Sequence, residues 1–278
     1  MRYNSYLVDT SETTRKIYIN EFNNNSPLRG HNNNNNNNCQ KNIKFNQWLS
    51  GLIDGDGCFG ITQNKYPNCE ITVALEDEKA LRQIQNKFGG YIKLRSGVKA
   101  IRYRLHNKKG IINLINAVNG NIRHTKRLVQ LHNVCTLLNI DVISPIILNK
   151  NNSWFIGFFD ADGTIGYYFK NNIPQLTISV TNKYLSDVQP YKNLFGGNIY
   201  FDKSQNGYYK WSIQSKKDIL NFINYAKNNS ASKTIKQKRL LLINNYYYLI
   251  EIKAYKASIE TIKYKAWLTF NKKWNKLS

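Results

Sequence analysis

Two stretches of this sequence decide its fold: WLSGLIDGDGCFGI over residues 48–61 and WFIGFFDADGTIGY over residues 154–167. Each begins with tryptophan, continues through apolar and small residues, and ends in two aspartates separated by glycine or alanine. The second aspartates of the two stretches, Asp56 and Asp162, lie 106 residues apart. The same pattern written twice is the first indication that the chain contains a repeat.

Landmarks further along the chain recur at almost the same offset. The sequence FGG over 88–90 returns over 195–197, at an offset of 107 residues. The pair Lys108 and Lys109 returns as Lys216 and Lys217, at an offset of 108 residues. Three landmarks at nearly one offset predict an internal duplication, with two halves of similar fold.

The charge balance points to a polyanionic partner. The chain has 40 Lys and Arg against 17 Asp and Glu, a formal net charge of +23. Such a charge destabilises a compact chain through self-repulsion, so binding to a polyanion is the natural explanation. Nucleic acid fits better than a membrane, because no unbroken apolar run reaches about 18 residues and the basic residues are spread over the whole chain. A merely solvated basic surface is the alternative.

Cysteine usage and composition bear on the compartment. The four cysteines form no CxxC pair, and His132 with Cys135 is the nearest approach to a zinc spacing, so a zinc site is disfavoured. Reduced, mostly buried thiols suit an intracellular protein. The N-terminal segment carries acids that a transit peptide normally lacks, and heavy use of Asn, Lys, Ile and Tyr indicates an AT-rich genome. We therefore expect a mitochondrial, organelle-encoded product.

Hydrophobic periodicity predicts the order α-β-β-α-β-β-α in each half. An apolar helix ends at the acidic cluster, two alternating strands follow, a helix leads into the FGG turn, and two more strands precede a last helix. The N-terminal region, with the polyasparagine run 32–38, has the composition of a disordered leader. The predicted boundaries are 1–44 for the leader, 45–148 for the first half-domain, 149–153 for the linker, 154–250 for the second half-domain and 251–278 for a basic C-terminal extension.

Alternation in the later strands of each half predicts one apolar and one basic or polar sheet face. A sheet with helices on its apolar face can lay its polar face along DNA, where Arg, Lys and Gln pair with purine edges in the major groove. A solvated sheet face is the alternative, although acids are scarce on these faces. The side chains predicted to contact DNA are Lys93, Arg95, Arg102, Arg104, His106, Lys210, Ser212 and Gln214.

Both acidic clusters follow an apolar, helix-like run that contains small residues. Gly51 and Gly157 would let two such helices approach closely, and the glycine after each run permits the turn that ends a helix. Side-by-side packing would gather Asp56 and Asp162 at the negative ends of two helix dipoles, an arrangement that favours bound cations. A turn or a calcium-like loop would explain one cluster, but not the same cluster twice after the same tryptophan.

From about Phe45 to about Tyr248, these motifs and their spacing resemble the LAGLIDADG homing endonucleases in their single-chain, two-motif form. The resemblance implies a duplicated αββαββα fold of the α/β class, with two halves related by pseudo-twofold symmetry. The motif helices would form the interface between the halves, and two four-stranded antiparallel sheets would form a saddle for DNA. Ile156, at the second motif position, is larger than the family's usual small residue, which predicts a looser or shifted helix contact.

The resemblance also implies the site residues. The family's metal-binding acid is the eighth motif position, here Asp56 and Asp162, and the carbonyl before it also binds metal, here Gly55 and Ala161. The sixth-position aspartates are expected to cap and order the turn instead. The other residues implied are the basic Lys126 in the first half, Lys233 or Lys236 in the second, and the near-site polar pair Glu76 and Asn182, with the first-half register open by one residue.

These residues predict the chemistry. Divalent metals held by acids about 4 Å apart can activate water and stabilise the charge of phosphodiester hydrolysis, and oxygen ligands favour Mg²⁺. The predicted function is site-specific double-strand cleavage of DNA by a monomeric, intron-encoded endonuclease that needs no membrane. The alternative is an RNA maturase that binds its host group I intron and assists its splicing. Retention of both motif aspartates favours the nuclease, and also disfavours an inactive DNA-binding regulator.

Overall fold

The computed structural model describes residues 32–277 apart from 205–206, 230–231 and 233, with side chains from residue 38 onward. Both halves show the predicted order, each followed by further helices. The first half consists of α1 (Asn32–Asp56), β1 (Gly57–Thr62), β2 (Tyr66–Ala74), the 3-10 helix η1 (Leu75–Asp77), α2 (Glu78–Phe88), β3 (Tyr91–Leu94), β4 (Ala100–Leu105), α3 (Lys108–Val118) and α4 (Thr125–Leu138).

The second half begins at the second motif helix. It consists of α5 (Trp154–Asp162), β5 (Gly163–Lys170), β6 (Ile173–Asn182), α6 (Leu185–Phe195), β7 (Asn198–Asp202), β8 (Tyr208–Ile213), α7 (Lys216–Asn228), α8 (Ile235–Leu241), α9 (Ile243–Glu251), the 3-10 helix η2 (Ala254–Lys256) and α10 (Ile262–Lys276). The duplication expected from the sequence is therefore present in the fold. No helix in the described part of the chain is long and apolar enough to cross a membrane.

Each half contains one four-stranded antiparallel sheet. The strand orders, β1-β2-β4-β3 and β5-β6-β8-β7, are the same path written twice. The registers agree as well, since Gly57 pairs with Ile71 and Gly163 pairs with Val180 at the start of each sheet. In β4 the odd-numbered residues are buried, whereas Arg102 and Arg104 are half-buried on the opposite face. The predicted alternation of this strand is confirmed.

The FGG landmarks are the turns that lead from a helix into the third strand. The second glycine of each, Gly90 and Gly197, has a positive φ of 83° and 77°. A side chain is excluded there, because a Cβ on Gly90 would lie 2.5 Å from the Arg104 carbonyl oxygen and one on Gly197 would lie 2.3 Å from that of Ser212. Glycine is required at these positions by both conformation and space.

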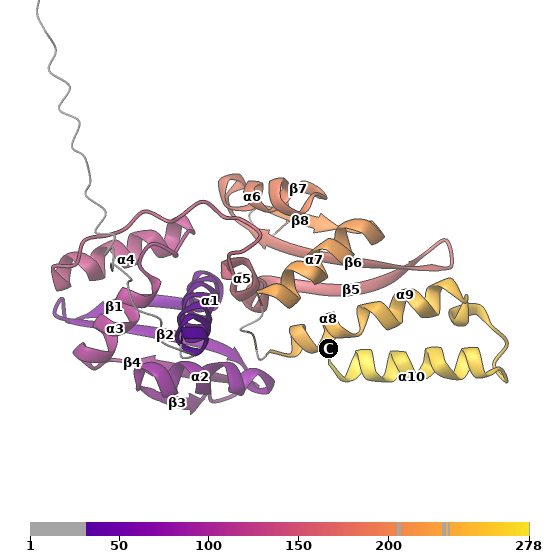
Figure 1. Cartoon of the computed structure of the whole chain (residues 1–278), viewed down its shortest axis with the longest axis horizontal. Coiled ribbons are helices and arrows are strands. Elements are labelled where there is room, and N and C mark those ends of the chain that lie inside the picture. Colours follow the sequence, from indigo (N-terminus) through magenta and orange to yellow (C-terminus); the bar gives the residue numbers. More distant parts are fainter. Residues whose placement is uncertain (1–31, 205–206, 230–231, 233, 278) are drawn as a thin grey trace, which may run out of the picture.

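Helices α1 and α5 pack side by side at the centre of the molecule, with one sheet on either side of the pair (Figure 1). The contact is close because the third motif position is glycine in both helices. A Cβ on Gly51 would lie 1.9 Å from the Trp154 carbonyl oxygen, and one on Gly157 would lie 1.8 Å from that of Trp48. The looser contact expected from Ile156 is therefore wrong. Ile156 is itself buried, and the glycines set the helix separation.

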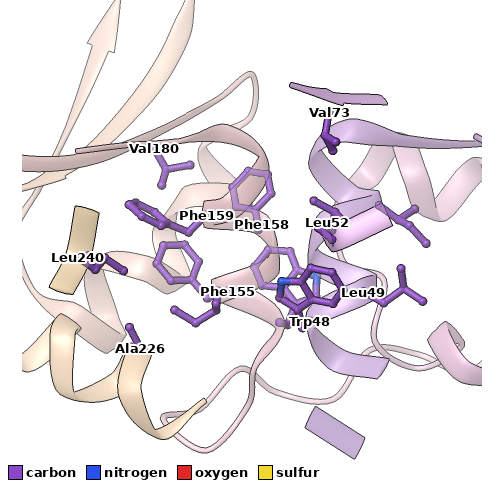
Figure 2. Close-up of a cluster of buried hydrophobic side chains, with 14 of the residues drawn as sticks. Trp48, Leu49, Leu52, Val73, Phe155, Phe158, Phe159, Val180, Ala226 and Leu240 are labelled. Atoms are coloured by element: carbon purple, nitrogen blue, oxygen red, sulfur yellow. The ribbon is translucent and has the colours of Figure 1, made fainter. Parts of the chain in front are cut away.

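The motif helices also carry the apolar core. Figure 2 shows Leu49 and Leu52 on the side of the first half, Phe155 and Phe159 on the side of the second, and Trp48 between them. All five side chains are at most 1% exposed. The second motif is therefore aromatic for a reason of packing, because its phenylalanines fill the core of its own half.

The predicted leader is wrong over its last residues. Helix α1 begins at Asn32, inside the polyasparagine run, and so covers residues that were expected to be disordered up to 44. A helix already fixed at its C-terminal end gains one hydrogen bond per added residue, which lets it extend through a polar sequence. Lys87 of α2 adds side-chain contacts to this extension, with its Nζ 3.3 Å from Asn42 Oδ1 and 3.0 Å from Asn46 Oδ1. Residues 1–31 lie outside the described residues.

The linker and the C-terminal segment are also integrated into the fold. The connection from α4 to α5 spans residues 139–153, and its end is buried, with the Ser153 N–H donating to Gln47 Oε1 at 3.0 Å. Helix α10 buries Trp267, Phe270 and Trp274, whose rings lie 5.6 to 6.4 Å from the ring of Tyr167 in β5. The segment 251–278, expected to be an extension, therefore completes the core of the second half.

Candidate active site

The C-terminal ends of the two motif helices meet, which places their last aspartates together. Helix α1 ends at Asp56 and helix α5 at Asp162. The position that a Cβ would take on Gly55 lies 2.3 Å from the Ala161 Cβ and 3.0 Å from Asp162 Oδ2. Glycine at residue 55 thus admits the other helix's acid. The structure brings together all four residues that the resemblance assigned to metal binding.

The electrostatics of this pair are unfavourable without a cation. Burial, followed by the nearby Asp162, raises the pKa of Asp56 from 3.8 to about 7. Burial also raises the pKa of Asp162. The carbonyl ends of two helix dipoles add further negative potential at the same place. Carboxylate and carbonyl oxygens gathered in this way are the donors that hard divalent cations prefer.

One cation from each half lies against the end of its own motif helix. In the first half, the Arg127 guanidinium donates to the carbonyl oxygens of Ile53 at 3.1 Å and Gly55 at 3.2 Å. In the second half, Lys236 Nζ lies 2.7 Å from the carbonyl oxygen of Asp160 and 2.5 Å from that of Ala161. Burial lowers the pKa of Lys236, although four aspartates act in the opposite direction.

These contacts bear on the basic residues expected from the sequence. Of the two candidates in the second half, Lys236 lies at the site and Lys233 is outside the described residues. In the first half Lys126 is exposed, and the neighbouring Arg127 makes the contacts that correspond to those of Lys236. Both Lys126 and Arg127 lie in the first turn of α4, so they differ only in the direction of their side chains.

The sixth-position aspartates do order the turn, and they also join the halves. Asp54 accepts from the backbone N–H of Arg123 at 2.9 Å, just before α4. Its Oδ2 also accepts from the indole N–H of Trp154, in the other motif, at 2.7 Å. The reciprocal bond runs from the Trp48 indole to Asp160 Oδ2 at 2.8 Å. The tryptophan that opens each motif is therefore the hydrogen-bond partner of the other motif's buried acid.

Two further acids cross between the halves. Asp77, at the end of η1, accepts from the backbone N–H of Ile235, the first residue of α8, at 2.7 Å. Asp187 of α6 likewise hydrogen-bonds the Thr125 side chain at the start of α4, although burial still raises its pKa to about 6. Asp77 also acts electrostatically on Asp56 and Lys236. Each helix that supplies a basic site residue is thus held at its N-terminus by the opposite half.

The near-site polar pair differs from expectation in the first half. Glu76 is exposed, and Asp77, one residue further along, is the acid near the motif ends. Asn182 lies close to the first half's α4, with its Nδ2 3.2 Å from Nδ1 of His124. The structure therefore brings Asn182 to the interface between the halves and points to Asp77 in place of Glu76.

The exposed face of the first sheet is strongly basic. Register places Lys93 beside Arg102, and Tyr91 beside Arg104. A concave region of about 300 Å³ is lined by Lys93, Leu94, Arg95, Ser96, Arg102 and Arg104. Glu70 lies within this face, with its carboxylate oxygens 3.1 Å from Arg102 and 2.8 Å from Arg104. His106 stacks on Tyr91 at 6.0 Å between ring centroids. The five predicted residues of this half lie on or beside one face, and Glu70 is an acid that the alternation did not reveal.

The exposed face of the second sheet is mostly uncharged. Lys210 is half-buried, and Gln214, just past β8, accepts from the Gln175 side-chain amide at 3.3 Å. Ser212 is only 6% exposed, because β6 and β7 set Ser179 and Asn198 on either side of it. A base contact from Ser212 is therefore disfavoured. Exposed or half-buried side chains on the face that the sequence reading missed are Tyr168, Lys170 and Gln175.

Comparison with known proteins identifies the family. Residues 49–138 match the family described as LAGLIDADG endonuclease. An intron-encoded DNA endonuclease of Dictyostelium discoideum is 35% identical over 238 residues, which cover 83% of this chain and 75% of that protein. The chain therefore belongs to the LAGLIDADG endonuclease family.

Two longer relatives are more similar in sequence. A protein of Debaryomyces hansenii named as a probable intron-encoded endonuclease is 61% identical over 99% of this chain, and an intron-encoded RNA maturase of Saccharomyces cerevisiae is 60% identical over 97%. The chain spans less than half of each, 45% and 44%. Among solved structures, the I-LtrWI LAGLIDADG homing endonuclease bound to target DNA aligns with a TM-score of 0.63 at 16% identity, over 85% of this chain and 98% of that one. That likeness confirms the fold.

Proposed function

We propose that this chain is a site-specific DNA endonuclease that cuts both strands of a double helix. The observation that carries the proposal is the meeting of Asp56 and Asp162 at the ends of two closely packed helices in a protein of net charge +23. A nucleic acid-binding protein without catalysis would have no use for two desolvated carboxylates side by side, which destabilise the fold.

The metal would be held by Asp56, Asp162 and the carbonyl oxygens of Gly55 and Ala161. Their oxygen donors fit Mg²⁺, and a divalent cation there supplies an activated water and stabilises the charge on the scissile phosphate. The chain's own cations, Arg127 and Lys236, lie close enough to polarise phosphate or water. The two exposed sheet faces would position the DNA, one half-site on each, and one chain suffices because it contains both halves.

The names of the relatives place such a protein in an intron, and we propose that this chain is likewise intron-encoded and acts in the mitochondrion. Its DNA target would then be the uninterrupted form of its own insertion locus. The test is incubation of the purified chain with a plasmid carrying that locus, with and without Mg²⁺. Cleavage of both strands at one position, lost in Asp56→Asn, supports the proposal. Intact plasmid with wild-type protein at saturating Mg²⁺ contradicts it.

A second candidate function is assistance of intron splicing. It is favoured by one observation, the 60% identity over 97% of this chain to a relative named as an RNA maturase. The two functions separate in one experiment, in which intron RNA binding and DNA cleavage are measured on the same preparation. RNA binding that survives Asp56→Asn together with absent cleavage by wild type would favour the maturase.

A further inference from the structure

The carbonyl oxygens at the ends of the motif helices are engaged by the protein's own cations. Lys236 Nζ reaches three of them in α5, at 3.3 Å from Phe159, 2.7 Å from Asp160 and 2.5 Å from Ala161. Arg127 reaches two in α1, those of Ile53 and Gly55. Ala161 and Gly55 are equivalent positions of the two motifs. Each half therefore uses one basic side chain for the same task.

The surroundings of Lys236 show what this task offsets. Its ammonium faces Asp160 and Asp162 of α5, Asp56 of α1 and Asp77 of η1, all of which act on it electrostatically. Arg127 acts in the same way on Asp56 and Asp162. Positive charge at a helix C-terminus is stabilising in itself. The two side chains thus supply, from within the chain, the positive charge that the acidic helix ends require.

A divalent cation in the proposed site would need the same oxygens. An ammonium that donates to the Ala161 carbonyl and a cation bound to that oxygen would be two positive charges a few ångströms apart, which repel strongly in a partly desolvated site. Lys236 has four flexible methylene groups, so its ammonium can move without displacement of the backbone. Arg127 lies at the edge of the same site and is only half-buried.

We propose that Lys236 and Arg127 are placeholder cations, which hold the Ala161 and Gly55 carbonyl oxygens in the metal-free protein and compete with the divalent cation for them. This inference rests on the proposed metal site. Once displaced, each side chain is a free donor next to the place where the scissile phosphate would lie. Metal binding and the presentation of a basic residue to DNA are thereby coupled. Lys236 should compete more strongly than Arg127, because it engages three carbonyl oxygens rather than two.

The test is the affinity of the full-length chain for Mn²⁺, measured by titration calorimetry in the absence of DNA. Lys236→Met should bind Mn²⁺ at least about tenfold more tightly than wild type, equivalent to about 1.4 kcal/mol. The matched control is Lys238→Met, which removes the same charge from an exposed position of the same helix. Its affinity should stay within about threefold of wild type. An unchanged or weaker affinity in Lys236→Met overturns the inference, as does an equal gain in both variants.

Two further measurements keep the test decisive. Should Lys236→Met fail to fold, Arg127→Met probes the same competition on α1, and a smaller gain in affinity is expected there. A crystal structure with Mn²⁺ should show Lys236 Nζ beyond about 3.5 Å from the Ala161 oxygen, and an unbroken bond beside a bound ion would refute the competition. The double variant Asp56→Asn, Asp162→Asn tests the proposed function separately. If it binds Mn²⁺ as wild type does, the metal site itself has been misplaced.

Discussion

A methyl group added at Gly157 should separate the motif helices and inactivate the protein. The new Cβ would lie 1.8 Å from the Trp48 carbonyl oxygen and 2.9 Å from the Leu52 nitrogen. Ordinary carbon–oxygen contacts begin at about 3.3 Å, so the helices must move apart by roughly 1.5 Å. Both obstacles are backbone atoms, which cannot rotate away as a side chain would.

The cost follows from two opposing effects. Overpacking of this kind destabilises by about 1–3 kcal/mol, and a backbone clash belongs at the upper end. Alanine is a better helix former than glycine by about 1 kcal/mol. The net loss in free energy of unfolding for Gly157→Ala should therefore be about 2 kcal/mol, or roughly 4–8 °C in melting temperature for a chain of this size. Displacement of the acids by about 1 Å should also lower cleavage by about 100-fold.

The assays are guanidinium denaturation and cleavage of the target plasmid. Gly166→Ala is the stability control, because its Cβ would meet no described atom within 4 Å, and alanine in a strand is no worse than glycine. It should unfold at the same denaturant concentration as wild type or a higher one. Stability of Gly157→Ala within about 0.5 kcal/mol of wild type, with full cleavage, would refute the idea that these glycines set the helix separation.

Four other outcomes are expected. Asp56→Asn should be more stable than wild type at pH 8 without metal. The pKa of Asp56, about 7 against 3.8, means that folding favours its protonated form, so wild-type stability falls as pH rises through that window, by at most about 4 kcal/mol; equal denaturation curves for the two proteins at pH 8 would count against this burial. Arg127→Met should lower the cleavage rate at least about tenfold and more than Lys126→Met does, and the reverse order would restore Lys126 as the basic site residue. DNA affinity should fall with salt at a log–log slope of roughly −5 or steeper, whereas a slope near −1 would mean that the net charge serves another purpose. Arg104→Ala should relax base preference at one or two positions of a single half-site, as cleavage of a randomised target library would reveal, and relaxation in both half-sites would contradict the assignment of one sheet to each.

Much of the fold could be predicted because its determinants are local and repeated. Alternation fixed which face of β4 is buried, and the FGG turns marked the end of a helix in both halves. The motif residues Asp56 and Asp162 were found for the same reason, since their pattern occurs twice. Helix α1 shows the limit of such reasoning. Its polyasparagine start has a poor helix propensity, and only the packing of its distal end extends the helix into it.

The residues that surround the acids depend on contacts that no local pattern records. Lys126 and Arg127 are adjacent on α4, and which one points at α1 depends on how α4 is rotated against the motif helix. The burial of Ser212 likewise depends on the strands beside it. A sequence cue did exist for the cross-half bonds, because each motif pairs an opening tryptophan with a sixth-position aspartate. Their connection to the opposite partner requires the helix contact itself.

That contact explains how the fold tolerates acids that oppose it. Glycine at the third motif position leaves the helix separation to backbone atoms, and the reciprocal tryptophan–aspartate bonds fix how far one helix slides along the other. The positions of Asp56 and Asp162 are then set by rigid elements rather than by flexible side chains. Burial raises the pKa of both, so they weaken the metal-free fold at neutral pH. The large apolar interface around Trp48 and Phe155 offsets that loss, and Lys236 reduces it, which lets the chain hold a preorganised cation site before any cation arrives.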